Sequence, residues 1–160
     1  IGLLSALILE KIKNCGEIYL SEPNQKRLEV CSKNLKSIST TPKDPSLKEN
    51  YFDLVFDTVG LEVTRNSAIK HVKPGGTIVH IGLSQPSGVF DFRKATLQEI
   101  TFIGTYCYTN KDFENTLDLL SKNKIGDLNW IEFKNLSSGA EAFKEIHDGT
   151  CSAPKIILIP

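Results

Sequence analysis

The feature that most constrains the fold is a short apolar run that ends in a carboxylate and then passes into a helix. The stretch Gly16–Arg27 reads GEIYLSEPNQKR, with the apolar residues Ile18–Leu20 at its centre. These residues favour a β-strand, and the Ser-Glu-Pro that follows favours a turn. An amphipathic helical pattern begins at Asn24. The stretch therefore predicts a buried strand with an acid at its carboxyl end, followed by a helix.

The acid at the end of this strand is Glu22. In dinucleotide-binding folds, a carboxylate at the end of the second strand accepts hydrogen bonds from the hydroxyls of the adenine ribose. Glu22 is placed for that role. It can equally be read as a solvated turn residue, because the specificity of this signal comes from a complete fingerprint. The stretch alone leaves both interpretations open.

Strands and helices alternate along the rest of the chain. Hydrophobic periodicity predicts helices over residues 1–14, 24–33, 62–72, 92–98, from 109 onward and over 138–146. Strands are expected at 17–21, 37–39, 51–57, 77–81, 101–106, 130–133 and 154–159, with a tight turn at 73–76. Thr109 with Asp112, and Ser138 with Glu141, have the spacing of helix-capping pairs. This alternation predicts an α/β fold with a parallel sheet covered by helices on both faces.

Composition narrows the classes of partner. The 160 residues are enough for one domain with a core, and 19 basic residues balance 19 acidic ones. This balance argues against a nucleic acid or an anionic membrane as the main partner. No apolar run reaches the roughly 18 residues of a membrane span. The four cysteines lack metal-ligand spacing and indicate reduced thiols in a cytoplasmic protein: Cys15, Cys31, Cys107 and Cys151.

Titratable residues outside the first strand are expected to be structural. His71, His80 and His147 have no second ligand at metal spacing, which favours a structural role for all of them. Asp57 ends the strongest predicted strand, YFDLVFD. No nucleophile or base lies near it in the sequence, so Asp57 is also expected to be structural.

Four segments together resemble the medium-chain dehydrogenase/reductase family, the zinc-type alcohol dehydrogenases and their polyol relatives. They are the opening IGLL, the stretch LSEPNQKRLEV, the pair FDLVFDTVG and KPGGTIVHIGL, and the run from FIGTYCYTNKDFENTLDLL through AEAFKEIHDG to KIILIP. Each motif is weak alone, but their order and spacing extend over essentially the whole chain. The resemblance implies a Rossmann-type doubly wound parallel sheet. Its first strand and the first two phosphate-loop glycines are missing from this sequence.

The resemblance also implies a domain organisation. Residues 1–108 are expected to form a truncated NAD-binding domain, and residues 109–160 a helix-strand segment that packs back on the catalytic domain of the full-length family. Zinc ligands and a proton relay belong to that catalytic domain, upstream of Ile1. This sequence by itself is therefore expected to hold no zinc and to have no dehydrogenase turnover.

The family's cofactor-binding positions carry over to particular residues here. The resemblance implies these positions: Gly2, Glu22, Arg27, Thr58, Val59, Ile81, Gly82, Leu83, Thr105 and Tyr106. Gly2 would let the first helix approach the pyrophosphate, and Glu22 would favour NAD over NADP. Arg27 would lie beside the adenine, or be a solvated cation. The Thr58–Gly60 turn would wall the adenine side, or be an ordinary turn.

The other positions would meet the nicotinamide. Gly82, between Ile81 and Leu83, would let the backbone approach closely. Thr105 and Tyr106 end the last strand of the predicted sheet, although Tyr106 could equally be a core aromatic residue.

These expectations favour the cofactor domain of an NAD-dependent alcohol or polyol dehydrogenase that passes hydride between NAD and a secondary alcohol or ketone. A zinc-free NADPH-dependent quinone or enone reductase and a non-catalytic nucleotide-binding module are the alternatives. The family resemblance also implies a homodimer through the strand at 101–107, whose apolar edge would be a liability if left exposed.

Overall fold

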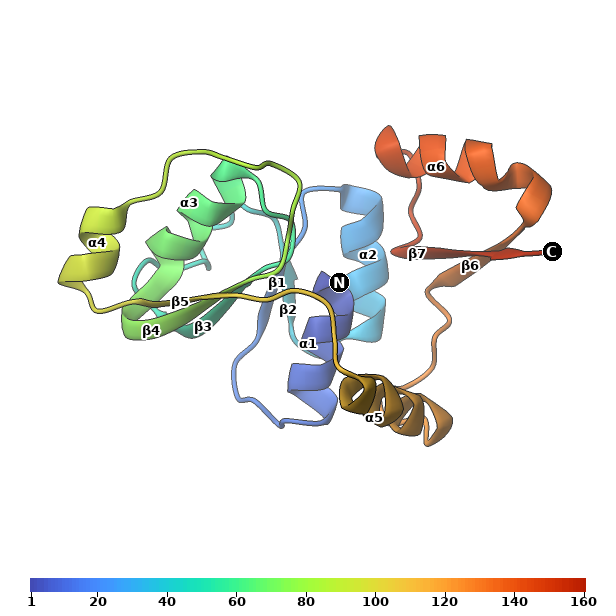
Figure 1. Ribbon diagram of the computed structural model, residues 1–160, viewed down its shortest axis with the longest axis horizontal. Helices are drawn as coiled ribbons and strands as arrows, with labels where there is room; N and C mark the ends of the chain where they lie inside the picture. The colour runs from blue at the N-terminus through green and yellow to red at the C-terminus, as the bar shows by residue number, and fades with distance from the viewer. The chain divides into compact units, whose positions relative to one another are not determined.

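The computed structural model describes residues 1–160, and these residues form two compact units (Figure 1). The first unit combines Ile1–Asp44 with Phe113–Pro160, and the second consists of Pro45–Asp112. These units differ from the expected division at residue 108. The assignment of 1–108 and 109–160 to functional domains stays a prediction.

The helices and strands follow the alternation that the sequence predicts. The helices are α1 Gly2–Lys11, α2 Gln25–Asn34, α3 Glu62–His71, α4 Phe92–Leu97, α5 Asn110–Ser121 and α6 Gly139–His147, with a 3₁₀ turn, η1, at Leu136–Ser138. The strands are β1 Tyr19–Ser21, β2 Ile38–Thr40, β3 Phe52–Asp57, β4 Val72–His80, β5 Thr101–Gly104, β6 Ile131–Asn135 and β7 Lys155–Ile159.

Every strand pairing is parallel. The first unit contains the pairs β1–β2 and β6–β7, and the second contains a sheet in the order β3-β4-β5. Parallel strands need crossover connections, and helices supply most of them here. The α/β class and its parallel sheets are therefore confirmed.

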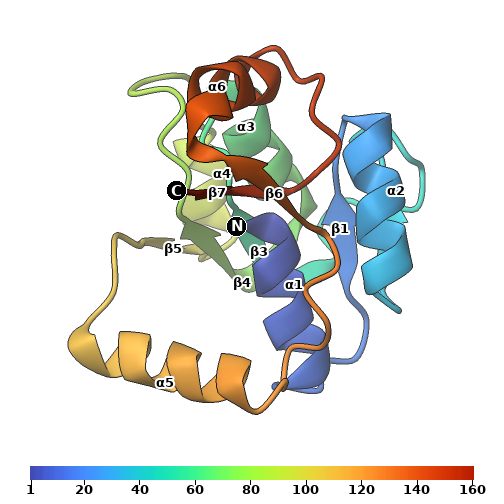
Figure 2. The same ribbon diagram turned by 90° about the vertical axis from the view of Figure 1, so that its right-hand side faces the viewer.

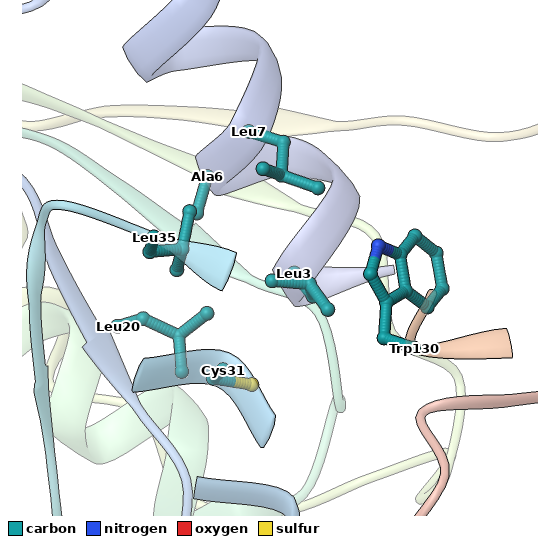
Figure 3. Close-up of a cluster of buried hydrophobic side chains, with 7 residues drawn as sticks. All are labelled: Leu3, Ala6, Leu7, Leu20, Cys31, Leu35 and Trp130. Atoms are coloured by element: carbon teal, nitrogen blue, oxygen red, sulfur yellow. The ribbon is translucent and has the colours of Figure 1, made fainter. Parts of the chain in front are cut away.

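The core of the first unit forms around α1, which is apolar on most of its surface. Figure 3 shows Leu3, Ala6 and Leu7 projecting from α1, with Leu20, Cys31 and Leu35 on one side of Leu3 and the Trp130 ring on the other. Leu7 is only 1% exposed. A helix with so little polar surface is stable only when packed on several neighbours, and this cluster provides them.

The carboxyl-terminal part of the first unit is a β6–β7 pair with α6 over one of its faces (Figure 2). Lys134 of β6 joins the strand to α6 through an ion pair with Glu145, and it also pairs with Glu132 on its own strand. Phe143 and Ile146 of α6 stay exposed. None of the helices in the chain has both the length and the apolar content needed to cross a bilayer.

In the second unit, α3 and α4 lie on the same side of the sheet (Figure 1). Ala68 and Ile69 of α3 pack against Val72 and Ile78 of β4, and Ala95 of α4 joins them at the edge of the cluster. The opposite face carries Leu54 and Ile103, which are 41% and 45% exposed. The helical layer therefore gives this unit a core on one side of its sheet.

Two local expectations are wrong. The residues 73–76 do not form a separate turn but lie within β4 as a bulge, because the register jumps from Phe52 opposite Val72 to Leu54 opposite Thr77. Gly75 has φ +73° in this bulge, and its N–H donates to the carbonyl of Gln98. The sequence predicted a tight turn here, whereas the strand pairing continues on both sides of the bulge.

Capping was predicted correctly at one helix and wrongly at another. Thr109 and Asp112 form the expected reciprocal pair: the Thr109 N–H donates to Oδ2 of Asp112 at 2.9 Å, and the Asp112 N–H donates to Oγ1 of Thr109 at 3.2 Å. Hydrogen bonds to the carboxylate from the Thr109 N–H and from the Thr109 hydroxyl lower the pKa of Asp112. Ser138 makes no side-chain cap, because the chain enters α6 from η1 and holds Ser138 at φ −90°, ψ 9°, outside the extended region that a capping residue adopts.

Candidate cofactor-binding site

Glu22 lies directly after β1, at the carboxyl end of the β1–β2 pair. Its N–H donates to the carbonyl of Thr40 at 3.0 Å, which extends the β1–β2 pairing by one residue. Its Oε1 accepts a hydrogen bond from the Asn24 N–H at 2.9 Å, while Oε2 has no partner within the chain. The side chain is 22% exposed. The turn therefore fixes the carboxylate through one oxygen and leaves the other for a ligand.

Asn24 caps α2 and ties this turn to the rest of the unit. Its Oδ1 accepts from the Arg27 N–H at 3.1 Å, and its Nδ2 donates to the carbonyl of Gly149 at 2.7 Å. Asn24 therefore both caps α2 and bonds to Gly149, which is 125 residues away in the sequence. This arrangement holds the Glu22 turn in place from both sides.

Arg27 extends toward the same carboxylate. Its Nη2 lies 3.4 Å from Oε1 of Glu22, and its Nε is buried without a hydrogen-bond partner. Thr40, at the end of β2, also has a buried and unpartnered hydroxyl and is 4% exposed. Sequence reasoning missed both the ion pair and Thr40, whose only signal was the parallel register that sets Ser21 opposite Thr40.

The charge of Glu22 reaches the core beneath it. Burial raises the pKa of the Cys31 thiol, and the negative charge of Glu22 raises it further. Cys31 lies on α2 and is 4% exposed. The protonated thiol therefore packs as a small apolar side chain under the acidic turn.

The start of α1 carries positive electrostatic potential. Gly2 is the first residue of the helix. Lys155 on β7 acts electrostatically on the backbone nitrogen of Ile1, the residue before α1. Lys155 therefore lies close to the amino end of α1, where unpaired N–H groups and the helix dipole favour an anion. Lys155 was not among the residues expected from the sequence.

In the second unit, the ends of β3 and β4 meet through glycine backbone. A Cβ atom on Gly60 would lie 2.1 Å from the carbonyl oxygen of Gly82, and one on Gly82 would lie 2.0 Å from the carbonyl carbon of Val59. Gly60 also has φ +78°. The Ser84 N–H donates to the carbonyl of Val59 at 3.2 Å, which continues the contact into the loop. The structure thus brings Val59, Gly60 and Gly82 together.

The remaining predicted residues of this unit border the same strand ends. Ile81 and Gly82 both donate their N–H groups to the carbonyl of Asp57, and the Thr105 N–H donates to the carbonyl of His80 at 2.9 Å. Leu83 and Tyr106 are 75% and 81% exposed, so Tyr106 is not a core residue. The carboxyl ends of parallel strands are where open α/β sheets bind ligands.

Asp57 has a base as its neighbour, contrary to the expectation from the sequence. Its Oδ2 lies 3.1 Å from Nδ1 of His80, and its Oδ1 accepts from the N–H groups of Val59 and Gly60 at 3.1 and 2.9 Å. Asp57 is 3% exposed. The Asp57–His80 pair follows from the parallel register of β3 and β4, which sets these two residues opposite each other. The sequence separation of 23 residues concealed it.

Comparison with known proteins decides the family. A family model described as "Zinc-binding dehydrogenase" matches residues 1–122. The chain belongs to the zinc-binding dehydrogenase family. The resemblance seen in its motifs is therefore confirmed, and the matched residues include all of those expected to bind the cofactor.

Two curated relatives of this dehydrogenase chain come from Saccharomyces cerevisiae. A probable diacetyl reductase [(R)-acetoin forming] is 32% identical in an alignment of 138 positions that covers 78% of this chain and 33% of the relative. An (R,R)-butanediol dehydrogenase is 27% identical in an alignment of 180 positions that covers 100% of this chain and 46% of the relative. The chain therefore spans less than half the length of these relatives.

Solved structures support the fold. The alcohol dehydrogenase of Aeropyrum pernix matches with a TM-score of 0.84 at 13% identity, over 98% of this chain and 46% of that one. The acetophenone reductase of Geotrichum candidum, solved in complex with NAD, matches with a TM-score of 0.82 at 18% identity, over 97% of this chain and 45% of that one. Both likenesses show that this dehydrogenase chain has the α/β fold of such enzymes.

The family is named for zinc binding, but this dehydrogenase chain contains no set of zinc ligands. Nowhere in residues 1–160 do three or more His, Cys, Asp or Glu side chains gather in a way that could hold a metal ion. Cys31 and Cys151 are buried, and Cys15 and Cys107 are exposed. Tetrahedral zinc needs three or four such ligands close together, so residues 1–160 do not supply a zinc site by themselves.

Proposed function

We propose that this chain is the nicotinamide-cofactor-binding part of an NAD-dependent alcohol or polyol dehydrogenase. The whole enzyme would pass hydride between NAD and a secondary alcohol or ketone, and any zinc would belong to its catalytic domain. NAD, when bound, supplies the hydride chemistry. The residues of this chain would bind the cofactor, orient it and select it against NADP.

The observation that carries the proposal is the geometry of Glu22. Its carboxylate lies at the carboxyl end of a parallel strand pair, with Oε1 fixed by the Asn24 N–H and Oε2 without a partner. An ionised carboxylate only accepts hydrogen bonds, and the two hydroxyls of a ribose can donate them. Glu22 would therefore accept from the adenine ribose of NAD. Arg27, next to Glu22, would lie beside the adenine.

The same residue would disfavour NADP. A 2′-phosphate would bring a charge near −2 against the carboxylate, and two unit charges about 4 Å apart repel by about 4 kcal/mol at an effective dielectric of about 20. Arg27, 3.4 Å from Glu22, offsets part of this repulsion. The preference for NAD should therefore be about tenfold, which corresponds to about 1.4 kcal/mol.

Within the first unit, the amino end of α1 would hold the pyrophosphate. Gly2 places no side chain at this helix end, and Lys155 adds a positive charge near it. Exposed N–H groups, the helix dipole and a lysine together suit a phosphate group.

Within the second unit, the strand ends would hold the rest of the cofactor. The Thr58–Gly60 turn would wall the adenine, with Thr58 and Val59 as contacts. The backbone of Ile81–Leu83 would meet the nicotinamide carboxamide, and Thr105 with Tyr106 would lie near the ring. Support comes from the exposure of Leu83 and Tyr106 at these strand ends.

Substitutions that remove one negative charge, made in the full-length protein, test the preference for NAD over NADP. Calorimetric titration should show NAD binding about tenfold tighter than NADP. Glu22→Gln should narrow that ratio to about threefold or less, because it weakens the bonds to NAD and removes the repulsion of NADP. Glu29→Gln makes the same change in charge on an exposed face of α2 and should leave the ratio unchanged. Equal or tighter binding of NADP by the unmutated protein would refute the proposed role of Glu22.

We further propose a homodimer that pairs through residues 101–107. β5 is an edge of its sheet, and all four of its residues are exposed. An apolar edge strand such as this one favours pairing with a second copy. Light scattering should give twice the mass of the chain. The Thr105 N–H donates to His80 of β4, so in this parallel register the Gly104 N–H points away from β4. Gly104→Pro removes this edge N–H group and should abolish the dimer, and a persistent dimer in this variant would exclude β5 as the interface.

We also propose that the protein is located in the cytoplasm. All four cysteines are free thiols, although two of them are exposed to solvent. Exposed free thiols are typical of a reducing compartment.

A further inference from the structure

The second unit contains a cleft whose aromatic side chains the proposed function does not use, although Gly82 and Leu83, proposed to meet the nicotinamide, lie at its border. Its volume is about 690 Å³, within the range of small-molecule sites. Three aromatic side chains line it: Phe90, Phe92 and Phe102. Phe92 and Phe102 are 72% and 46% exposed, so apolar rings of this cleft face solvent without a covering group.

The aromatic side chains are arranged as a connected wall. The Phe90 ring centroid lies 5.0 Å from that of Phe92 and 5.5 Å from that of Phe102, both in edge-to-face geometry. The His80 ring lies 5.5 Å from the Phe102 ring and is tilted by only 32° from it. The cleft is therefore lined by rings suited to a flat, apolar ligand.

A loop held by Arg65 closes one side of the cleft. The guanidinium donates to three backbone carbonyls: Nη1 to Gly60 at 2.9 Å and Gln85 at 3.2 Å, and Nη2 to Ser87 at 2.7 Å. The Glu62 N–H donates to the side-chain oxygen of Gln85 at 2.9 Å. These bonds form one wall of the cleft before any ligand arrives, and they use three of the five N–H donors of the guanidinium.

His80 is the polar group of the cleft that is set for a ligand. Its Nδ1 lies 3.1 Å from Oδ2 of Asp57, and its side chain is 18% exposed. An ionised carboxylate only accepts, so Nδ1 carries the hydrogen of this bond. In the neutral imidazole the lone pair is then on Nε2, and His80 presents an acceptor. Two further backbone donors, Val59 and Gly60, hold Asp57 in place.

We propose that this cleft binds a flat, uncharged aromatic molecule with a hydroxyl group, such as a phenol or naphthol. The rings of Phe90, Phe92 and Phe102 would pack on its apolar body, and the hydroxyl would donate to Nε2 of His80. Asp57 acts as a positioning residue, because it fixes the tautomer of His80. A carboxylate ligand is disfavoured, since it would bring a second negative charge toward Asp57 and meet a lone pair on Nε2.

The test is a matched pair of probes, 2-naphthol and 2-methylnaphthalene, added to the full chain without NAD. Both probes have the same bicyclic body, and only naphthol can donate a hydrogen bond. NMR titration should give a dissociation constant at least fivefold lower for naphthol. The ¹⁵N signal of Nε2 in His80 should shift on addition of naphthol and stay in place with the methyl compound.

Variants then assign the preference to His80. His80→Phe keeps an aromatic wall and should bind both probes equally, while His147→Phe, at an exposed position on α6, should keep the preference. Asp57→Asn can donate to Nδ1, which would move the ring hydrogen to Nε2. It should lower the affinity for naphthol without changing that for methylnaphthalene, and ¹⁵N shifts should report the changed tautomer.

Several results would overturn the proposal. They are equal affinity for the two probes in the unmutated chain, a naphthol preference that survives in His80→Phe, or shifts that map outside the cleft. If His80→Phe does not fold, the Nε2 signal of the unmutated chain decides alone. Because no nucleotide is present, failure here leaves the proposed cofactor preference untouched.

Discussion

The carboxyl ends of β1 and β3 present different chemistry. At the end of β1, the turn offers side chains: Glu22 with one free oxygen and Arg27 beside it. At the end of β3, the turn offers backbone, with Gly60 and Gly82 pressed together and Asp57 buried beneath them. Side chains can select a ligand by charge, whereas fixed backbone determines how closely anything can approach.

This difference has an energetic counterpart. Removing a solvent-accessible group at the end of β1 changes a few hydrogen bonds, and water can replace most of them. Adding a single methyl group at the end of β3 forces two strand ends apart, because no side chain there can move aside. Substitutions should therefore affect stability at β3 and local order or ligand choice at β1.

The largest effect is expected at Gly60. Gly60→Ala should lower the free energy of unfolding by about 3 kcal/mol or more, because it adds a Cβ against the Gly82 carbonyl at a positive φ. Chemical denaturation of both proteins measures this loss. Gly104→Ala is the matched control, since a Cβ there meets nothing within 4 Å. Similar losses in the two variants would mean that the Gly60–Gly82 contact is not specific.

A smaller effect is expected at Asn24, which supports the Glu22 turn. Asn24→Ala removes the α2 cap and the bond to Gly149, and should lower the free energy of unfolding by about 1–2 kcal/mol. Asn34→Ala makes the same chemical change at the other end of α2, where the side chain donates only to the Val30 carbonyl of the same helix, and should cost less, about 0.5 kcal/mol. Equal losses at the two positions would show that the cap contributes nothing beyond the substitution itself.

The smallest effect concerns Glu10 and depends on pH. Burial alone would raise the pKa of Glu10, but hydrogen bonds from the Ser37 side chain and from the Ser37 and Lys36 N–H groups outweigh it and lower the pKa. A lowered pKa in the folded state adds stability above the ordinary pKa of glutamate, and this stability is lost as the pH falls through the folded value.

Glu10→Gln should therefore be less stable than the unmutated chain at neutral pH and nearly equal to it in acid. Urea denaturation across this pH range measures the difference, with Glu29→Gln as a control that should show little pH dependence. A Glu10→Gln difference that stays constant with pH would contradict the assigned hydrogen bonds.

The comparison also shows what the sequence could predict. The strand, acid and helix of Gly16–Arg27 are adjacent in the chain, so local propensity was enough to place Glu22 and the start of α2. The Thr109–Asp112 cap was predicted for the same reason. When the interacting residues are close together in the sequence, their spacing is enough to predict how they meet.

Features that depend on strand register were not predictable in this way. The Asp57–His80 pair, the bulge at 72–76 and the buried Thr40 hydroxyl all follow from which residues face each other across parallel strands. Parallel strands are joined by long crossovers, so a sequence pattern does not fix their register. The Ser138 cap failed because η1 precedes α6, and the spacing of two residues does not reveal that turn.

The contact between Gly60 and Gly82 restricts how this chain can change. Most tight contacts can be relieved by a second substitution to a smaller residue, so two changes together succeed where one fails. Here both partners already have no side chain, and the atoms that would collide belong to the main chain. No compensating substitution exists at either position. New side chains for altering ligand choice therefore have to be introduced at neighbours such as Leu83, whose side chain already faces solvent.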